Sequence, residues 1–133
     1  MRMRLEAEGQ TPIDNVSETR VRSVVAKLRS YGPSSFASLT DEVGNYLQVA
    51  GGGVTCVIER RDASNNHHYR AFQDKRIAVF ADGTALVFGG GEVKLASNEW
   101  FTSQDVEDVF LAFLRGEQLP ARIKWRDITD LLR

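Results

Sequence analysis

The chain has 133 residues, of which 42% are hydrophobic and 26% are charged, and these values suit one globular domain with its own core. Seventeen basic and eighteen acidic residues give a formal net charge of −1, which argues against a dedicated nucleic-acid binder and against a strongly acidic nucleic-acid mimic. The sequence contains neither a signal-peptide pattern nor an apolar run of membrane-spanning length, so we expect a cytoplasmic protein without membrane contact.

A first helix is predicted near the N-terminus. Residues 1–12 are polar and aperiodic, and we expect them to be flexible. Ser17 is a candidate N-cap, and the apolar residues that follow recur at helical spacing over residues 18–30: Val21, Val24, Val25 and Leu28. The sequence YGPSS then ends the helix, because glycine and proline both disfavour its continuation.

Residues 36–96 form the predicted strand-rich core, because the hydrophobic period changes there to two. The strand-like segments are FASLT, NYLQVA, VTCVIERRD, HHYRAF and EVKLA. The segment RIAVFADGTALVF predicts a further hairpin, with Asp82–Gly83 as its two-residue turn. Triple glycines at 51–53 and 89–91 lie between strand-like segments and lack the Gly–Lys–Ser/Thr of a phosphate loop, so we interpret both as hairpin connections. Cys56 has no disulfide partner and is predicted to be a buried core residue.

Residues 102–126 are predicted to form a helix followed by an edge strand. Thr102 and Asp105 have the spacing of a capping box at the start of a helix over residues 103–115. One face of this helix carries Val106, Val109, Phe110, Phe113 and Leu114, and the opposite face carries Gln104, Asp108, Leu111 and Arg115. Gly116 suits a left-handed C-cap, Pro120 stops further helix, and ARIKW alternates as a strand does. DITDLL can form a last short helix.

The order of these elements predicts the fold class. A helix, a run of strands, a helix and a strand indicate a single α+β domain over residues 1–133, with an N-terminal and a C-terminal helix packed against a mainly antiparallel sheet. We expect about five to seven strands in that sheet. The expected core includes Val25, Leu28, Phe110, Phe113 and Trp125.

The sequence carries no clear catalytic pattern. Adjacent residues of a strand point to opposite faces, so His67 and His68 cannot readily bind one metal ion, and no marked nucleophile lies beside them. We therefore expect a protein that is not an enzyme and that uses no metal and no cofactor. The alternative is a small-molecule-binding or enzymatic α+β domain with a pocket on the open sheet face, formed by His67, His68, Tyr69 and Arg70. A weaker alternative is nucleic-acid binding through Arg60, Arg61, Arg70 and Arg76.

The C-terminal third resembles a family of immunity proteins. The residues that carry the resemblance are EVKLASNEWFTSQDVEDVFLAFLRGEQLPARIKW, with shorter likenesses in GNYLQVAGGG, VIERRD and HHYRA. They resemble the first numbered immunity family of bacterial polymorphic toxin systems, in which a capped helix ends in a Phe–Leu pair and is followed by glycine, proline and a strand with tryptophan. The matching positions here are Phe113, Leu114, Gly116, Pro120 and Trp125.

The resemblance implies a cytoplasmic inhibitor that binds and neutralises a cognate toxin domain, such as a deaminase or a nuclease, by blocking its active site. An acidic surface on such an inhibitor would complement the basic groove of a toxin that acts on nucleic acid. The candidate partner-binding residues are Glu99, Asp105, Glu107, Asp108 and Leu111. The alternative interpretation of these residues is an ordinary solvated helix face with one exposed leucine.

Overall fold

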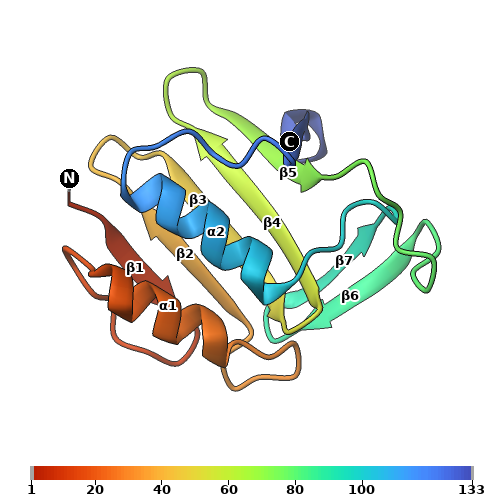
Figure 1. Ribbon diagram of the computed structural model, residues 1–133, viewed down its shortest axis with the longest axis horizontal. Helices are drawn as coiled ribbons and strands as arrows, with labels where there is room; N and C mark the ends of the chain where they lie inside the picture. Colours follow the sequence, from red (N-terminus) through yellow and green to blue (C-terminus); the bar gives the residue numbers. More distant parts are fainter. Residues whose placement is uncertain (1, 133) are drawn as a thin grey trace.

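The computed structural model describes residues 2–132 and contains a six-stranded antiparallel sheet, two helices and a separate two-stranded hairpin (Figure 1). In spatial order the strands of the large sheet are β1 (Arg4–Ala7), β2 (Phe36–Thr40), β3 (Tyr46–Gly52), β4 (Thr55–Asp62), β5 (His67–Phe72) and β8 (Lys124–Asp127). The other elements are α1 (Glu18–Lys27), α2 (Ser103–Leu114), the hairpin β6 (Thr84–Phe88) and β7 (Gly91–Leu95), and the 3-10 helix η1 (Thr129–Leu132). The predicted α+β fold is confirmed, and β8 is the predicted edge strand.

The ends of both helices follow from local chemistry. Ser17 caps α1 by accepting the backbone N–H of Arg20 at 3.2 Å. Thr102 and Asp105 form the predicted capping box of α2, in which each side chain accepts the other residue's backbone N–H. Gly116 follows α2 with a φ of +70°, the left-handed conformation that glycine adopts without strain. These contacts fix where α2 begins and ends, and therefore where the following chain can reach the sheet.

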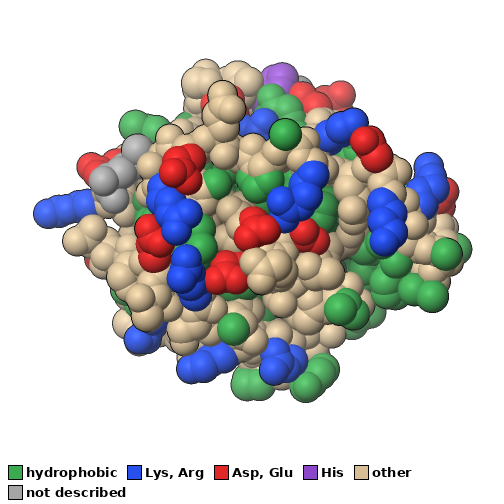
Figure 2. All heavy atoms as spheres, viewed as in Figure 1, with side chains coloured by type: hydrophobic (Ala, Val, Ile, Leu, Met, Phe, Trp, Pro, Cys, Tyr) green, Lys and Arg blue, Asp and Glu red, His purple; other side chains and the backbone are tan. Residues whose placement is uncertain are grey.

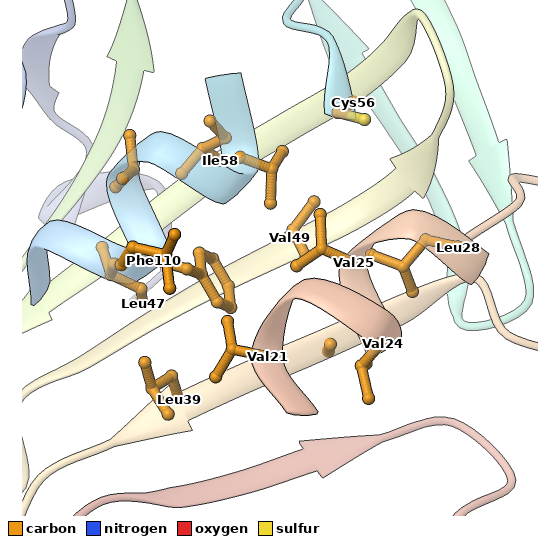
Figure 3. Packing of buried hydrophobic residues seen from close by; sticks show 14 of the residues in the cluster. Val21, Val24, Val25, Leu28, Leu39, Leu47, Val49, Cys56, Ile58 and Phe110 are labelled. Carbon is orange, nitrogen blue, oxygen red and sulfur yellow. The ribbon is translucent and has the colours of Figure 1, made fainter. Parts of the chain in front are cut away.

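The main core lies between the two helices and one face of the sheet (Figure 3). Phe110 of α2 is fully buried and lies beside Val21 of α1 and Leu47 of β3. The predicted core residues Val25 and Leu28 are also buried. The other two predicted core residues, Phe113 and Trp125, are only partly buried against this cluster. We call the side of the sheet that meets the helices the helix face.

The hairpin β6–β7 covers part of the opposite face of the sheet. Val57 of β4 points away from the helix face, because its two neighbours in the strand point toward it, and it packs with Leu86 and Leu95 of the hairpin. Trp100 completes this second cluster and stacks on Phe80 at 4.1 Å between ring centroids. We call this side the hairpin face.

The N-terminal segment differs from the prediction. Residues 1–12 were expected to be flexible, but β1 forms within them and pairs with β2 along its length. Leu5 is 2% exposed, and its backbone N–H and C=O also bond to Ile13. Four residues are too few to show a hydrophobic period, and the pairing that stabilises β1 comes from distant segments.

The predicted hairpin around Asp82–Gly83 is wrong. Residues 77–81 form no strand, and β6 pairs instead with β7 across the second triple glycine. Phe80 leaves the expected strand to stack on Trp100. Asp82 and Gly83 do form a turn, closed by the backbone N–H of Thr84 donating to the C=O of Ala81 at 3.0 Å, but no strand precedes it. The Asp82 carboxylate accepts the backbone N–H of Ser97 at 2.7 Å. The interpretation of both triple glycines as hairpin connections is confirmed.

Candidate functional site

The acidic residues of α2 are paired with arginines. Arg122 contacts Asp108 at 2.6 Å and Asp105 at 3.1 Å. Arg22 of α1 contacts Glu107 at 3.3 Å. Figure 2 shows basic and acidic side chains interspersed on this side of the molecule, without a patch of one sign. The proposed acidic surface is therefore largely neutralised within the chain.

Leu111 does not lie on an exposed face of α2. The residue is 6% exposed and belongs to the main core together with Ile123, and Leu119 packs against the same core. The chain after α2 therefore contributes apolar side chains to the core that contains Leu111. The helical period correctly separates Leu111 from the main apolar face of α2, but it does not predict that Leu119 and Ile123 pack into the same core.

Glu99 also lies outside any exposed acidic surface. Its side chain is 3% exposed, and it accepts the backbone N–H of Ala96 at 2.7 Å and Nη2 of Arg126 at 2.8 Å. Nη1 of Arg70 lies 4.0 Å from the same carboxylate. A buried carboxylate with these partners holds the structure together and is not available to a binding partner.

The four residues of the alternative pocket are divided between the two faces of β5. His67 and Tyr69 point to the helix face, whereas His68 and Arg70 point to the hairpin face. Their contacts agree with this division, because His67 bonds to Asp127 at 2.8 Å and Arg70 bonds to Glu59 at 2.8 Å. The structure therefore does not bring these four side chains into one pocket.

A row of polar side chains crosses the hairpin face, and sequence analysis missed it. Cross-strand pairing places six residues side by side, which we call the polar row: Glu6, Ser38, Gln48, Glu59, Arg70 and Arg126. Nε2 of Gln48 donates to Glu59 at 3.0 Å, and Nε of Arg70 donates to the other Glu59 oxygen. Only the register of all six strands aligns these residues, so no local motif reveals them.

A hollow of about 410 Å³ lies beside the polar row on the hairpin face. Ala50 and Val57 line its apolar part, together with the rings of Phe36 and Phe88, whose centroids are 6.1 Å apart. Its polar lining comes from four members of the polar row: Glu6, Ser38, Gln48 and Glu59. Its volume falls in the range of small-ligand sites.

A second candidate surface lies on the helix face, where Arg60 contacts two aromatic rings. The centre of its guanidinium lies 4.2 Å from the ring centroid of Tyr69 and 5.0 Å from that of Trp125. All three side chains are half-buried, and we call them the Arg60 cluster. Hydrogen bonds from Ser64 lower the pKa of Asp62, and the charge of Arg60 lowers it further. The buried Nε atom of Arg60 has no hydrogen-bond partner. Trp125 was expected to close the core, but it also forms part of this surface.

Cys56 is buried, and Asp127 is hydrogen-bonded to His67 and Thr129. Burial raises the pKa of the Cys56 thiol to about 12, so the thiol stays protonated near neutral pH. Hydrogen bonds from Thr129 lower the pKa of Asp127, and His67 lowers it further. Within the described residues, no group of three or more His, Cys, Asp or Glu side chains is arranged to hold a metal ion.

The four arginines considered for nucleic-acid binding do not share one surface. Arg60 points to the helix face, whereas Arg61 and Arg70 point to the hairpin face. Arg76 lies in the loop before the hairpin and bonds to Asp82 at 3.0 Å. These positions do not form the continuous basic stripe that tracks a phosphate backbone.

Comparisons of this chain with protein-family models, curated proteins and solved structures found no match. The resemblance to an immunity family therefore stays a prediction. Across residues 2–132, no helix is both long enough and apolar enough to cross a membrane.

Proposed function

We propose that this protein is a cytoplasmic inhibitor that binds a bacterial toxin domain, a deaminase or a nuclease, and blocks its active site. The Arg60 cluster is the observation that carries the proposal. Arginine, tyrosine and tryptophan are the residues most enriched at the energetic centres of protein interfaces. Two rings hold the guanidinium of Arg60, so little conformational entropy is lost when a partner binds it.

The charge of Arg60 fits the chemistry of such a toxin. Zinc-dependent deaminases use a catalytic glutamate. An arginine fork matches the geometry of a carboxylate and binds it with two parallel hydrogen bonds. Arg60 interacts electrostatically with Asp62, but its Nε atom has no hydrogen-bond partner, so the guanidinium can still donate to an acidic residue of the toxin.

The resemblance to immunity proteins also favours the Arg60 cluster as the binding surface. The resembling segment, residues 92–125, covers most of β7, all of α2, the Gly116 cap and the start of β8, and it ends at Trp125 of the Arg60 cluster. The residues that suggest an immunity protein are therefore adjacent to the strongest candidate contact. We infer that this unit both completes the sheet and presents part of the toxin-binding surface.

Co-expression with a toxin domain encoded by a neighbouring gene tests the proposal. The intact chain should restore growth and bind the purified toxin domain. Arg60→Met keeps the length and much of the packing of the side chain but removes its charge, and it should weaken binding by about 2 kcal/mol, or about 30-fold. Arg20→Met makes the same change at an exposed arginine of α1 and should leave the affinity unchanged.

Two results separate the function from the surface. If the intact chain neither binds the toxin domain nor restores growth, the inhibitor assignment is wrong. If it restores growth and Arg60→Met binds as tightly as the unmodified chain, the function stands and the Arg60 cluster is not the contact. Thermal unfolding of each variant controls for loss of folded protein.

The hollow on the hairpin face favours a second candidate function, the binding of a small molecule. Its volume of about 410 Å³ and its mixture of apolar and polar lining suit such a ligand. Saturable binding of a metabolite at this hollow, in a chain that does not neutralise the toxin, would favour this function over inhibition.

A further inference from the structure

β8 is an open edge of the six-stranded sheet. The backbone N–H of Ile128, just after β8, donates to the C=O of His68 at 2.8 Å, and the pairing of β5 with β8 continues in this register. In an antiparallel pair, every second residue turns its backbone groups away from the neighbouring strand. The N–H and C=O groups of Trp125 and Asp127 therefore point outward, and none of them bonds to another backbone group within residues 2–132.

The opposite edge of the sheet is covered. The outward backbone groups of Leu5 in β1 exchange two hydrogen bonds with Ile13, each 2.9 Å long. The C=O of Met3 accepts the backbone N–H of Val16 at 3.1 Å, so residues 13–16 run along the outer side of β1. Outward donors and acceptors at a two-residue spacing match the backbone of an extended strand. β8 is therefore the edge at which a further strand can be added.

A hollow of about 630 Å³ adjoins this open edge. Trp125 points to the helix face and Arg126 to the hairpin face, yet both line the hollow, so the hollow reaches the edge of the strand between them. Lys94 and Leu95 at the end of β7 line it as well. The space beside β8 can therefore hold side chains of an added strand.

The charges of β8 argue against pairing with a second copy of this chain. Its hairpin face carries Lys124 and Arg126, which contact Asp74 and Glu99 but stay about half exposed. When two β8 strands pair about a two-fold axis, each register that joins their outward groups places two cations, or two Asp127 side chains, opposite each other. A strand of another protein with acidic residues opposite Lys124 and Arg126 avoids this repulsion.

We propose that an extended segment of the toxin adds to β8 as a seventh strand, an inference that rests on the proposed inhibitory function. Its backbone bonds to the outward N–H and C=O groups of Trp125 and Asp127. The toxin side chain opposite Trp125 points to the helix face, where the guanidinium of Arg60 lies 5.0 Å from the centroid of the tryptophan ring. An acidic residue at this position accepts hydrogen bonds from Arg60, so the added strand and the Arg60 cluster form one continuous contact.

Amide hydrogen exchange tests the added strand directly. It is measured by NMR on the full chain, with and without the purified toxin domain. In the free chain the amides of Trp125 and Asp127 should exchange quickly, whereas the amide of Arg126, which faces β5, should be protected. In the complex the first two should exchange at least about tenfold more slowly. If Arg60→Met weakens toxin binding but these two amides exchange as in the free chain, the inhibitor function stands and the added strand is wrong.

Proline variants test the same contact through affinity. Asp127→Pro removes an outward N–H and leaves the hydrogen bonds to β5 in place. It should weaken toxin binding at least about tenfold relative to Asp127→Ala, which also loses the carboxylate contacts with His67 and Thr129. Ala7→Pro makes the same change at an outward N–H of β1 and should leave the affinity unchanged.

The remaining outcomes separate the strand from the function. Equal affinities of Asp127→Pro and Asp127→Ala would overturn the added strand, and if Asp127→Pro unfolds, the exchange measurement on the unmodified chain decides. Sedimentation of the free chain as a dimer, with the amides of Trp125 and Asp127 protected, would show that a second copy occupies the edge instead of the toxin. If the intact chain neither binds the toxin domain nor restores growth, the inhibitor function is wrong, and the toxin strand falls with it.

Discussion

The two faces of the sheet are built from the same strands but differ in composition and in cover. On the helix face, Leu39, Leu47 and Ile58 are fully buried beneath α1 and α2. On the hairpin face, the neighbouring positions Ser38, Gln48 and Glu59 belong to the polar row, and the hairpin covers only part of the surface. The period-two alternation of these strands separates apolar core residues from polar ones, except near β8, where Arg60 and Tyr69 of the helix face remain half-buried.

The two faces should respond differently to mutation. The helix face depends on close packing of apolar groups, whereas the hairpin face depends on an ion network that joins strands β4, β5 and β8 to Glu99. Loss of an apolar side chain leaves a cavity, and loss of one buried charge leaves its partner unpaired. Mutations on the two faces can therefore distinguish the contribution of apolar packing to the free energy of unfolding from the contribution of polar interactions.

The largest effect is expected for Phe110→Ala on the helix face. Phe110 is fully buried between both helices and the sheet, so its removal should lower the free energy of unfolding by about 3–5 kcal/mol. Denaturant titration followed by circular dichroism measures this loss. Val87→Ala is the control, because Val87 is 63% exposed and should change stability by less than about 0.5 kcal/mol. Similar effects of the two substitutions would contradict the central place of Phe110 in the core.

Glu99→Gln should produce the next largest loss. The substitution keeps the shape of the side chain but removes the charge that faces Arg126 and Arg70, and it should lower the free energy of unfolding by about 2 kcal/mol. Arg126 is half exposed, which lets water replace part of the lost interaction. Glu117→Gln removes an exposed carboxylate 3.9 Å from Arg115 and is the matched control. If both variants are equally stable, the buried network contributes no more than a surface ion pair.

Local patterns predicted the helices because their signals lie close together in the chain. The Ser17 cap, the Thr102–Asp105 capping box and the Gly116 end all depend on contacts within a few residues. β1 and the course of residues 77–81 depend on distant partners, Phe36–Thr40 in one case and Trp100 in the other. Single-sequence periodicity contains no information about those partners.

The candidate site was harder to predict for the same reason. The polar row combines residues from six strands, and the Arg60 cluster combines residues from β4, β5 and β8. Glu99 was grouped with the acidic residues of α2 because it is near them in sequence, but its carboxylate bonds Arg126, 27 residues away. Leu111 was predicted to be exposed from the helical period, which contains no information about the chain that follows α2 and packs with Leu111 in the core. The sequence did identify Trp125 as an important position, although not its contact with Arg60.

A pH-dependent effect of intermediate size is expected for Cys56, which is buried on the helix face. Burial raises the pKa of its thiol from an ordinary value of 9.0 to about 12, so the folded protein keeps this proton at a pH where the unfolded chain releases it. The contribution of Cys56 to stability is therefore complete below pH 9.0 and decreases above it, by about 1.4 kcal/mol per pH unit. Denaturant titrations of the unmodified chain and Cys56→Ala should diverge in this way above pH 9.0. Parallel pH profiles would show that the thiol does not titrate as its burial predicts.

The smallest effect is expected for Asp108→Asn on the outer surface of α2. The Asp108 carboxylate contacts Arg122 at 2.6 Å, but both side chains are more than one-third exposed, and water screens such pairs. The free energy of unfolding should fall by less than about 0.5 kcal/mol, well below the loss for Glu99→Gln. Because Arg122 already neutralises Asp108 and Asp105, toxin binding should also change little. Denaturant titration and toxin-binding isotherms measure both quantities. A loss of toxin affinity as large as that of Arg60→Met would place the contact surface on α2 instead of at the Arg60 cluster.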